Sequence, residues 1–253
     1  MNFESEIKSI VDSFAPITLK EMDDVCLMRR VDMKFVFNTS LLPALLKKAA
    51  INYYVLDINQ VREQVYETTY YDTNEYAMYN LHHNGKQNRY KVRVRKYVSS
   101  DMGFLEVKRK TNKGETIKNR IVCPAPYHDI DFDGSSKFLQ KFTPYDEQIL
   151  WPKLSNRFIR ITLVNKDRSE RITIDYKLIF KDLKYHEQII PSNLCIAEIK
   201  RNRDSQKSSF LNTLNELHIK PSGFSKYCVG LAMLNPEVKT NLFKQKIRAL
   251  YRL

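Results

Sequence analysis

The sequence predicts an α+β domain built on a large antiparallel β-sheet. About eight segments alternate polar and apolar residues, as strands with one buried face do. The joins at 111–115 and 166–169 are short and rich in Asn, Gly, Asp and Ser, which is typical of hairpin loops. Helical spacing is confined to the flanks and the C-terminal end. A sheet of this size either splits into a sandwich or closes into a barrel.

The local patterns place the elements in order. Residues 3–25 predict one or two short amphipathic helices broken at Pro16. Alternation predicts strands at 27–38, 62–71, 88–98, 103–110, 116–123, 154–165, 170–180 and 195–201, with shorter candidates at 55–56 and 185–190. Helical patterns follow at 40–50, 74–83, 124–153, 206–217, 225–234 and 236–250.

No shift in composition, repeat or low-complexity segment divides the chain. We therefore expect residues 1–253 to form one domain. Within it, 1–25 is a helical N-terminal extension, 27–235 is the body built on the sheet, and 236–253 is a C-terminal helix.

Several classes of site are excluded by composition. The six glycines form neither a dinucleotide-binding nor a Walker-type loop. The four cysteines are widely spaced, and His186-Glu187 lacks the second histidine of a zinc-binding helix, so we expect reduced, mostly buried thiols and no zinc.

The longest apolar run, at 228–234, is too short to span a bilayer. Glu4 and Glu6 stand where a signal peptide carries lysines, which predicts a cytoplasmic protein.

Positive charge is concentrated in one part of the chain. The net charge is +13, and residues 89–120 hold eleven basic side chains against three acidic ones. An anionic partner is the leading inference, and nucleic acid, an anionic membrane surface and a polyanionic small substrate all fit it.

The period of two in a strand shows where these charges point. Arg89, Lys91, Arg93 and Arg95 share one face, opposite Val92 and Val94. Other strands repeat the pattern, with shared faces formed by Glu106, Lys108 and Lys110, by Lys118 and Arg120, by Arg171, Thr173, Asp175 and Lys177, and by Ile196, Glu198 and Lys200. Any one such strand fits a solvated face. The sum predicts repulsion that a bound polyanion would offset, as in a barrel lined with Lys and Arg.

Glu198 is the carboxylate of greatest interest. It is either a salt-bridge partner for nearby lysines or a ligand for Mg²⁺ or Mn²⁺, which proteins hold with one or two carboxylates plus substrate phosphates. Glu106 and Asp175 face the same choice and are weaker metal candidates.

Taken in order, the short motifs of this chain resemble the VTC domain, the polyphosphate-polymerase branch of the triphosphate tunnel metalloenzymes. The motifs are Arg30-x-x-x-Lys34-Phe35, Tyr70-Tyr71-Asp72-Thr73, Lys91-Val-Arg93-Val-Arg95, Glu106-Val-Lys108-Arg-Lys110, Asn156-Arg157, Arg171-x-x-x-Asp175, Ala197-Glu198-Ile-Lys200 and Phe224-Ser225-Lys226-Tyr227. The resemblance implies an eight-stranded antiparallel tunnel, with flanking helices and a helical C-terminus, that moves the γ-phosphoryl group of ATP onto polyphosphate with Mn²⁺ or Mg²⁺.

The resemblance also implies roles for individual residues. It implies phosphate-binding side chains at Lys34, Arg93, Arg95, Lys108, Lys118, Arg157 and Lys226, and a metal ligand at Glu198. The shared strand faces add Lys91, Arg171 and Lys200 to the phosphate-binding set. The predicted catalytic residues are Arg93, Arg95, Glu198 and Lys226.

Two departures and two alternatives accompany this prediction. The first strand lacks the Glu-x-Glu-x-Lys of the cyclase and thiamine-triphosphatase branch, and Gly223 stands where the eukaryotic polymerase has a second lysine. No membrane helices are fused to the domain, so we expect it to work as a free catalytic domain or with a separate membrane partner. The alternatives are a tunnel triphosphatase and a non-catalytic polyanion-binding module. Nucleic acid is not expected, because Tyr97 alone is a poor stacking platform.

Overall fold

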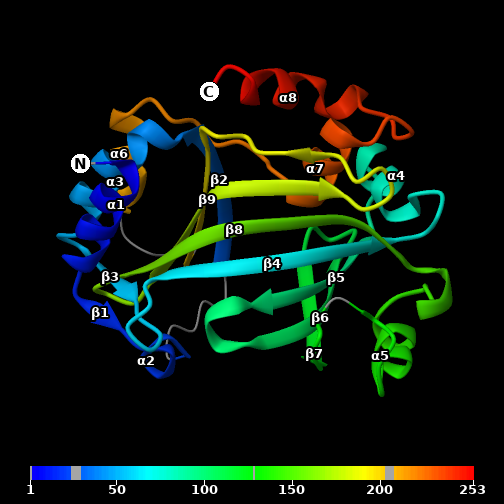
Figure 1. Cartoon of the computed structure of the whole chain (residues 1–253). Coiled ribbons are helices and arrows are strands. Elements are labelled where there is room, and N and C mark those ends of the chain that lie inside the picture. The colour runs from blue at the N-terminus through cyan, green and yellow to red at the C-terminus, as the bar shows by residue number, and fades with distance from the viewer. Residues whose placement is uncertain (1, 24–29, 128, 203–207) are drawn as a thin grey trace.

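The computed structural model describes residues 2–23, 30–127, 129–202 and 208–253 (Figure 1). Eight strands form one continuous path in which every neighbouring pair is antiparallel. Along that path they are β2 (Arg30–Asn38), β11 (Leu194–Asn202), β9 (Glu170–Asp182), β8 (Trp151–Asn165), β4 (Glu63–Asp72), β5 (Arg89–Tyr97), β6 (Met102–Lys110) and β7 (Thr116–Cys123). Short strands β1 (Pro16–Ile17), β3 (Tyr53–Leu56) and β10 (Gln188–Ile189) attach to it. The predicted eight-stranded antiparallel sheet is confirmed. The first residues predicted for β2, 27–29, lie outside the described residues.

Three groups of helices cover the sheet (Figure 1). Helices α1 (Phe3–Asp12), α3 (Leu42–Ala49) and α6 (Ser209–Glu216) bury one apolar cluster, and α4 (Ala77–His83), α7 (Lys226–Leu234) and α8 (Lys244–Leu250) contribute to a second. Helix α5 (Ser135–Phe142) packs on a third apolar cluster, beside β5 and β6. Helix α2 (Leu19–Asp23) is a short helix that follows β1. The helical prediction for 124–153 is wrong over most of its length, because only α5 and one 3₁₀ turn form there and β8 begins at Trp151.

The sheet curls without closing, which corrects the expectation of a closed barrel. No ladder joins β2 to β7 in the part of the chain that the structure describes. The segment before α7 occupies the free edge of β2 instead: Pro221 forms a bridge with Phe35, and the Ser222 amide donates to the Lys34 carbonyl at 2.6 Å. Because those edge groups are already paired, the edge of β2 is blocked to β7 at this point.

Strand β5 shows how sequence alternation sorts the two faces of the sheet. Val92 and Val94 are buried against α5, in a cluster that also holds Leu139. Lys91 and Arg93 point to the opposite, concave face. The predicted sorting is confirmed, since apolar residues on this strand gain from burial under α5 while the long cations keep to the concave side.

Irregular pairing between β8 and β9 changes the alternation. The register shifts between Arg157 and Ile159, and Lys177 has a left-handed φ of 50°. Lys177 therefore leaves the concave face and pairs with Glu4 of α1, so the prediction that it shares a face with Asp175 is wrong. A bulge of this kind re-aims every side chain beyond it.

Helix α7 lies against the concave face at one end, and Gly230 permits its close approach. A Cβ at Gly230 would stand 2.6 Å from Phe180 Cδ1 and 2.9 Å from Leu154 Cδ2, closer than side chains pack. Tyr227 stacks on Tyr70 of β4 with ring centroids 5.2 Å apart. The packing brings the first residue of α7, Lys226, to the concave face.

Candidate active site

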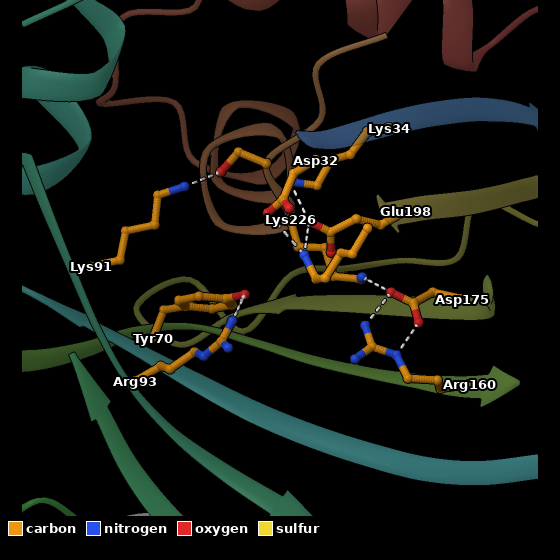
Figure 2. A network of polar contacts seen from close by, with 11 residues as sticks. Asp32, Lys34, Tyr70, Lys91, Arg93, Arg160, Asp175, Glu198 and Lys226 are labelled. Carbon is orange, nitrogen blue, oxygen red and sulfur yellow. Dashed lines mark hydrogen bonds and ion pairs between the residues drawn. The ribbon is translucent and has the colours of Figure 1, made fainter. Parts of the chain in front are cut away.

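The start of α7 is held by two hydrogen-bonding groups. Asp72 accepts from the Tyr227 hydroxyl at 2.6 Å and from the Met78 and Tyr79 amides of α4 at 2.8 and 2.9 Å. Ser225 caps α7 by accepting from the Cys228 amide at 3.2 Å. Its hydroxyl also accepts from Lys91 Nζ at 2.8 Å (Figure 2). Side chains from β4, β5 and α7 are thus fixed relative to one another.

Asp175 is a buried carboxylate between two cations (Figure 2). It accepts two hydrogen bonds from Arg160, at 2.6 and 2.8 Å, and one from Lys226. Burial favours a raised pKa for Asp175, but the charges of Arg160 and Lys226 outweigh it and lower the pKa to about 2. Asp175 stays ionised at neutral pH and orients both cations.

Glu106 repeats this arrangement on β6. Its side chain is 1% exposed and contacts Arg93 at 2.6 and 2.7 Å as well as Lys118. Burial acts to raise the pKa of Glu106, yet the cations Arg93, Arg95 and Lys118 hold it well below its usual range. We call Arg93, Arg160 and Lys226, with their partners Glu106 and Asp175, the floor of the site.

Glu198 on β11 contacts two lysines through the same oxygen. Lys200 donates to Oε1 at 2.7 Å, and Lys34 Nζ lies 3.5 Å from it. Lys200 also contacts Asp32 at 3.0 Å. Burial would raise the pKa of Glu198, but the charges of Lys200 and Lys34 lower it.

Beside the floor lies a cavity of about 500 Å³ whose lining includes Lys34, Lys91 and Lys108. Burial, together with the charges of Lys34 and Lys91, lowers the pKa of Lys108 to about 7. Partial desolvation beside the floor also lowers the pKa of Lys118, whose side chain is still 40% exposed, to about 8, although Glu106 opposes the shift. Lys108 has no carboxylate within ion-pair distance among the described residues. These ammonium groups would be stabilised by a bound anion.

The structure brings most of the predicted phosphate-binding residues to the concave face. Each of them lines the cavity or pairs with a carboxylate there: Lys34, Lys91, Arg93, Lys108, Lys118, Lys200 and Lys226. Arg95 is buried beside them, with Nε 3.3 Å from Thr68 Oγ1. Arg171 is the ladder neighbour of Lys200, which places it on the same face near the start of β9.

Arg157 is the exception, and its predicted position is wrong. Its side chain is 56% exposed on the other face of β8, where Nε lies 3.6 Å from Glu67. Arg160, three residues further along β8, lies on the opposite side of the strand and points inward to Asp175 instead. Sequence reasoning missed Arg160 because the family resemblance pointed to Arg157, and alternation alone does not show which face of β8 is the concave one. Sequence reasoning also gave no site role to Tyr70, which it named only within the motif Tyr70-Tyr71-Asp72-Thr73. The Tyr70 hydroxyl lies 3.4 Å from Arg93 Nη1.

A divalent cation fits Glu198, whose side chain is 19% exposed, better than the buried carboxylates Glu106 and Asp175. Glu106 and Asp175 are each enclosed by two cations. The described contacts of Glu198 all end on Oε1, so Oε2 remains for a hard cation that takes its other ligands from substrate phosphates and water. No group of three or more metal-ligating side chains gathers among the described residues.

Comparison with known proteins identifies the family. The family model named VTC domain matches residues 29–235. The chain belongs to the VTC domain family. A search of curated proteins returns no match.

Several solved structures are similar to this chain over about four fifths of its length. A "putative adenylate cyclase" from Bacillus halodurans has a TM-score of 0.51 at 8% identity, covering 78% of this chain and 94% of that one. One from Vibrio parahaemolyticus has a TM-score of 0.46 at 12% identity, covering 79% and 95%. A third, from Hippeastrum and with a dominant triphosphatase activity, has a TM-score of 0.48 at 12% identity, covering 83% and 99%. At these identities the likeness concerns the fold alone.

None of the described helices has the length and apolar character needed to cross a membrane.

Proposed function

We propose that this protein is a phosphotransferase that moves the γ-phosphoryl group of ATP onto the end of a polyphosphate chain. The excess of cations on the concave face supports this most directly. Among the described residues, at least ten basic side chains lie with four carboxylates there. The cations are Lys34, Lys91, Arg93, Arg95, Lys108, Lys118, Arg160, Arg171, Lys200 and Lys226, and the carboxylates are Asp32, Glu106, Asp175 and Glu198. Such an excess suits a ligand that carries several negative charges close together.

The floor suits phosphoryl transfer. This reaction needs charge stabilisation and in-line alignment of the attacking and leaving oxygens rather than a nucleophilic side chain. Arg93 and Arg160 are locked in place by buried carboxylates, so their remaining N–H groups are oriented before substrate arrives. In the proposed step an anionic oxygen of the acceptor chain bonds to the γ-phosphorus. The bond from that phosphorus to the β–γ bridging oxygen breaks, and ADP leaves.

The acid–base character of the site favours a phosphate acceptor over water. An attacking water must lose a proton, and a carboxylate of low pKa is a weak base. Glu106, Asp175 and Glu198 all have lowered pKa values, and burial with nearby cations lowers the pKa of His82 to about 3. An anionic phosphate oxygen needs no base. A bound chain would keep Lys108 protonated, because negative charge raises the pKa of an adjacent ammonium.

Glu198 would hold a divalent cation, Mn²⁺ or Mg²⁺, together with oxygens of the substrate. The cation would neutralise part of the phosphate charge when bound. Lys34 and Lys200 keep Glu198 ionised, which a metal ligand requires.

The decisive experiment incubates the purified protein with ATP and Mn²⁺, and measures polyphosphate on a gel, ADP and free phosphate together. A ladder of polyphosphate with ADP in matching amount is the expected result. Free phosphate without polymer would identify a triphosphatase. If tripolyphosphate binds but ATP is not consumed, the protein is a polyanion-binding module. A parallel reaction with EDTA tests the need for the cation.

A further inference from the structure

The row of cations on the concave face continues outward past the predicted phosphate-binding residues. On β5, Arg89 lies one step further out than Lys91 on the same face. On β6, its ladder partner Lys110 lies one step further out than Lys108. A step of two residues along a strand is roughly 7 Å. Arg89 and Lys110 line the same cavity as Lys91 and Lys108, so they extend its basic lining.

A third cation reaches this opening from the C-terminal helix. Lys246 of α8 is partly buried and lines the cavity. A Cβ on Gly223 would lie 3.6 Å from its Nζ, so the ammonium is close to the segment that covers the edge of β2. Lys246 lies beyond residues 29–235, which the family model matches. We call Arg89, Lys110 and Lys246 the rim.

The rim lacks the counter-charges that the floor has. Within the described parts of the chain, no carboxylate lies at ion-pair distance from Lys110 or Lys246. Arg89 Nη1 donates a hydrogen bond to the Lys86 carbonyl at 2.9 Å. Asp32 is the acidic residue in the cavity lining, and it already contacts Lys200. Three clustered cations without internal partners favour an external anion.

We propose that the rim is a binding subsite for the distal phosphates of a polyphosphate chain, those beyond the three that a triphosphate would place inside. The identity of the ligand rests on the proposed function. The cations from Arg95 to Arg89 are spaced along six residues of one strand, roughly 20 Å. A linear ligand with repeated charge can follow such a row out to the rim.

The rim suits polyphosphate better than nucleic acid. Single-stranded nucleic acids bind by stacking bases on exposed aromatic rings as well as by charge. Two phenylalanine rings line the cavity. Phe243 is 2% exposed and packs against Tyr79 and His83, and Phe224 is partly buried against the same apolar cluster. The cavity therefore has no row of exposed rings on which successive bases could stack.

The test measures binding by calorimetry, without turnover, of tripolyphosphate and of a polyphosphate about 20 units long. Lys246→Glu should weaken the long chain about tenfold or more and tripolyphosphate less than about twofold. Lys110→Glu should act in the same direction. The matched control is Lys244→Glu, which makes the same charge change on an exposed position of α8 outside the cavity lining. The salt dependence of long-chain binding should fall by about one ion in Lys246→Glu.

Other results would overturn the rim assignment. Equal weakening of both ligands by Lys246→Glu would mean that the rim has no separate subsite. Equal effects of Lys246→Glu and Lys244→Glu would mean a general field effect. An oligothymidylate of equal charge that binds as tightly as the long chain, and loses affinity in Lys246→Glu, would assign the rim to nucleic acid. Failure of the wild type to bind either phosphate ligand would instead refute the proposed function.

Discussion

The floor and the rim hold the same kinds of cation in different surroundings. In the floor, Arg93, Arg160 and Lys226 each contact a carboxylate that is at most 4% exposed. In the rim, Lys110 and Lys246 have no such partner among the described residues. The difference shows that fixed geometry and excess charge are supplied by separate regions. The floor is oriented before a ligand arrives, whereas the rim contributes mainly attraction.

The largest expected effect follows from removing a floor carboxylate. Asp175→Asn leaves Arg160 and Lys226 buried without their counter-charge, so the free energy of unfolding should fall by about 3–5 kcal/mol. Chemical denaturation of the apo protein measures it. The rim variant Lys110→Ala is the control and should change stability by less than about 0.5 kcal/mol. Because an anion can replace the lost charge, tripolyphosphate should raise the melting temperature of Asp175→Asn more than that of the wild type. Equal stability of Asp175→Asn and wild type would remove the distinction between floor and rim.

The next effect concerns Glu198, which is the more exposed carboxylate, at 19% against 4% for Asp175. Glu198→Gln should reduce Mn²⁺-dependent turnover about 1000-fold, or about 4 kcal/mol, since it removes the proposed metal ligand. The melting temperature without Mn²⁺ should change little compared with that of Asp175→Asn. Binding of Mn²⁺ in the presence of tripolyphosphate, followed by electron paramagnetic resonance, should weaken in parallel. Unchanged Mn²⁺ binding would make Glu198 a salt-bridge partner only.

A pair of arginines on β8 tests the floor within a single strand. Arg160→Ala should lower turnover about 100-fold, or about 2.7 kcal/mol, because it removes a pre-oriented guanidinium. Arg157→Ala removes an exposed side chain on the other face and should change turnover less than about twofold. Steady-state kinetics of both variants measure the difference. The reverse order of effects would show that Arg157, as the family resemblance implied, contacts the phosphates.

These two arginines also show where sequence reasoning succeeds and fails. Strict alternation on β5 and β6 correctly sorts Lys91, Arg93 and Lys108 from Val92 and Val94. On β8, Arg157 and Arg160 are three residues apart and therefore lie on opposite faces, but alternation alone does not show which of the two faces is the concave one. Local patterns predict which side of a regular strand a side chain takes, but the register between strands depends on the whole sheet.

The expected repulsion among like charges is offset in the floor but persists at Lys108, whose pKa is lowered in part by Lys34 and Lys91. Glu106 and Asp175 pair with the floor cations across neighbouring strands and at the start of α7. Sequence alternation placed these carboxylates on the right face. It could not show that each would lie between two cations, since that contact joins residues far apart in the chain. The edge of β2, occupied by Pro221 and Ser222 instead of β7, escaped prediction for the same reason.

The smallest effect is a pH dependence that arises beside the floor. Burial and neighbouring cations lower the pKa of Lys108 to about 7, and partial desolvation lowers that of Lys118 to about 8. The affinity for tripolyphosphate should therefore fall about tenfold between pH 7 and pH 9, as these lysines lose the charge that attracts the ligand. Binding at pH 8 should take up protons, measured by calorimetry in two buffers of different ionisation enthalpy. The terminal phosphates of the ligand also lose protons over part of this window, so the ligand's own contribution is measured with Lys108→Met, in which the lysine charge is absent.

The stability of the apo protein should change in the opposite direction over the same window. A lysine with a lowered pKa holds fewer protons in the folded than in the unfolded state between its folded pKa and about 10.4, so folding becomes more favourable as pH rises. Melting temperatures of the apo protein should rise from pH 7 to pH 9 while ligand affinity falls. In Lys108→Met, which keeps the length of the side chain without its charge, both slopes should shrink. A wild-type affinity that is flat from pH 7 to pH 9, with no proton uptake, would mean that Lys108 and Lys118 remain charged in the apo protein and that their burial does not distinguish them from the rim.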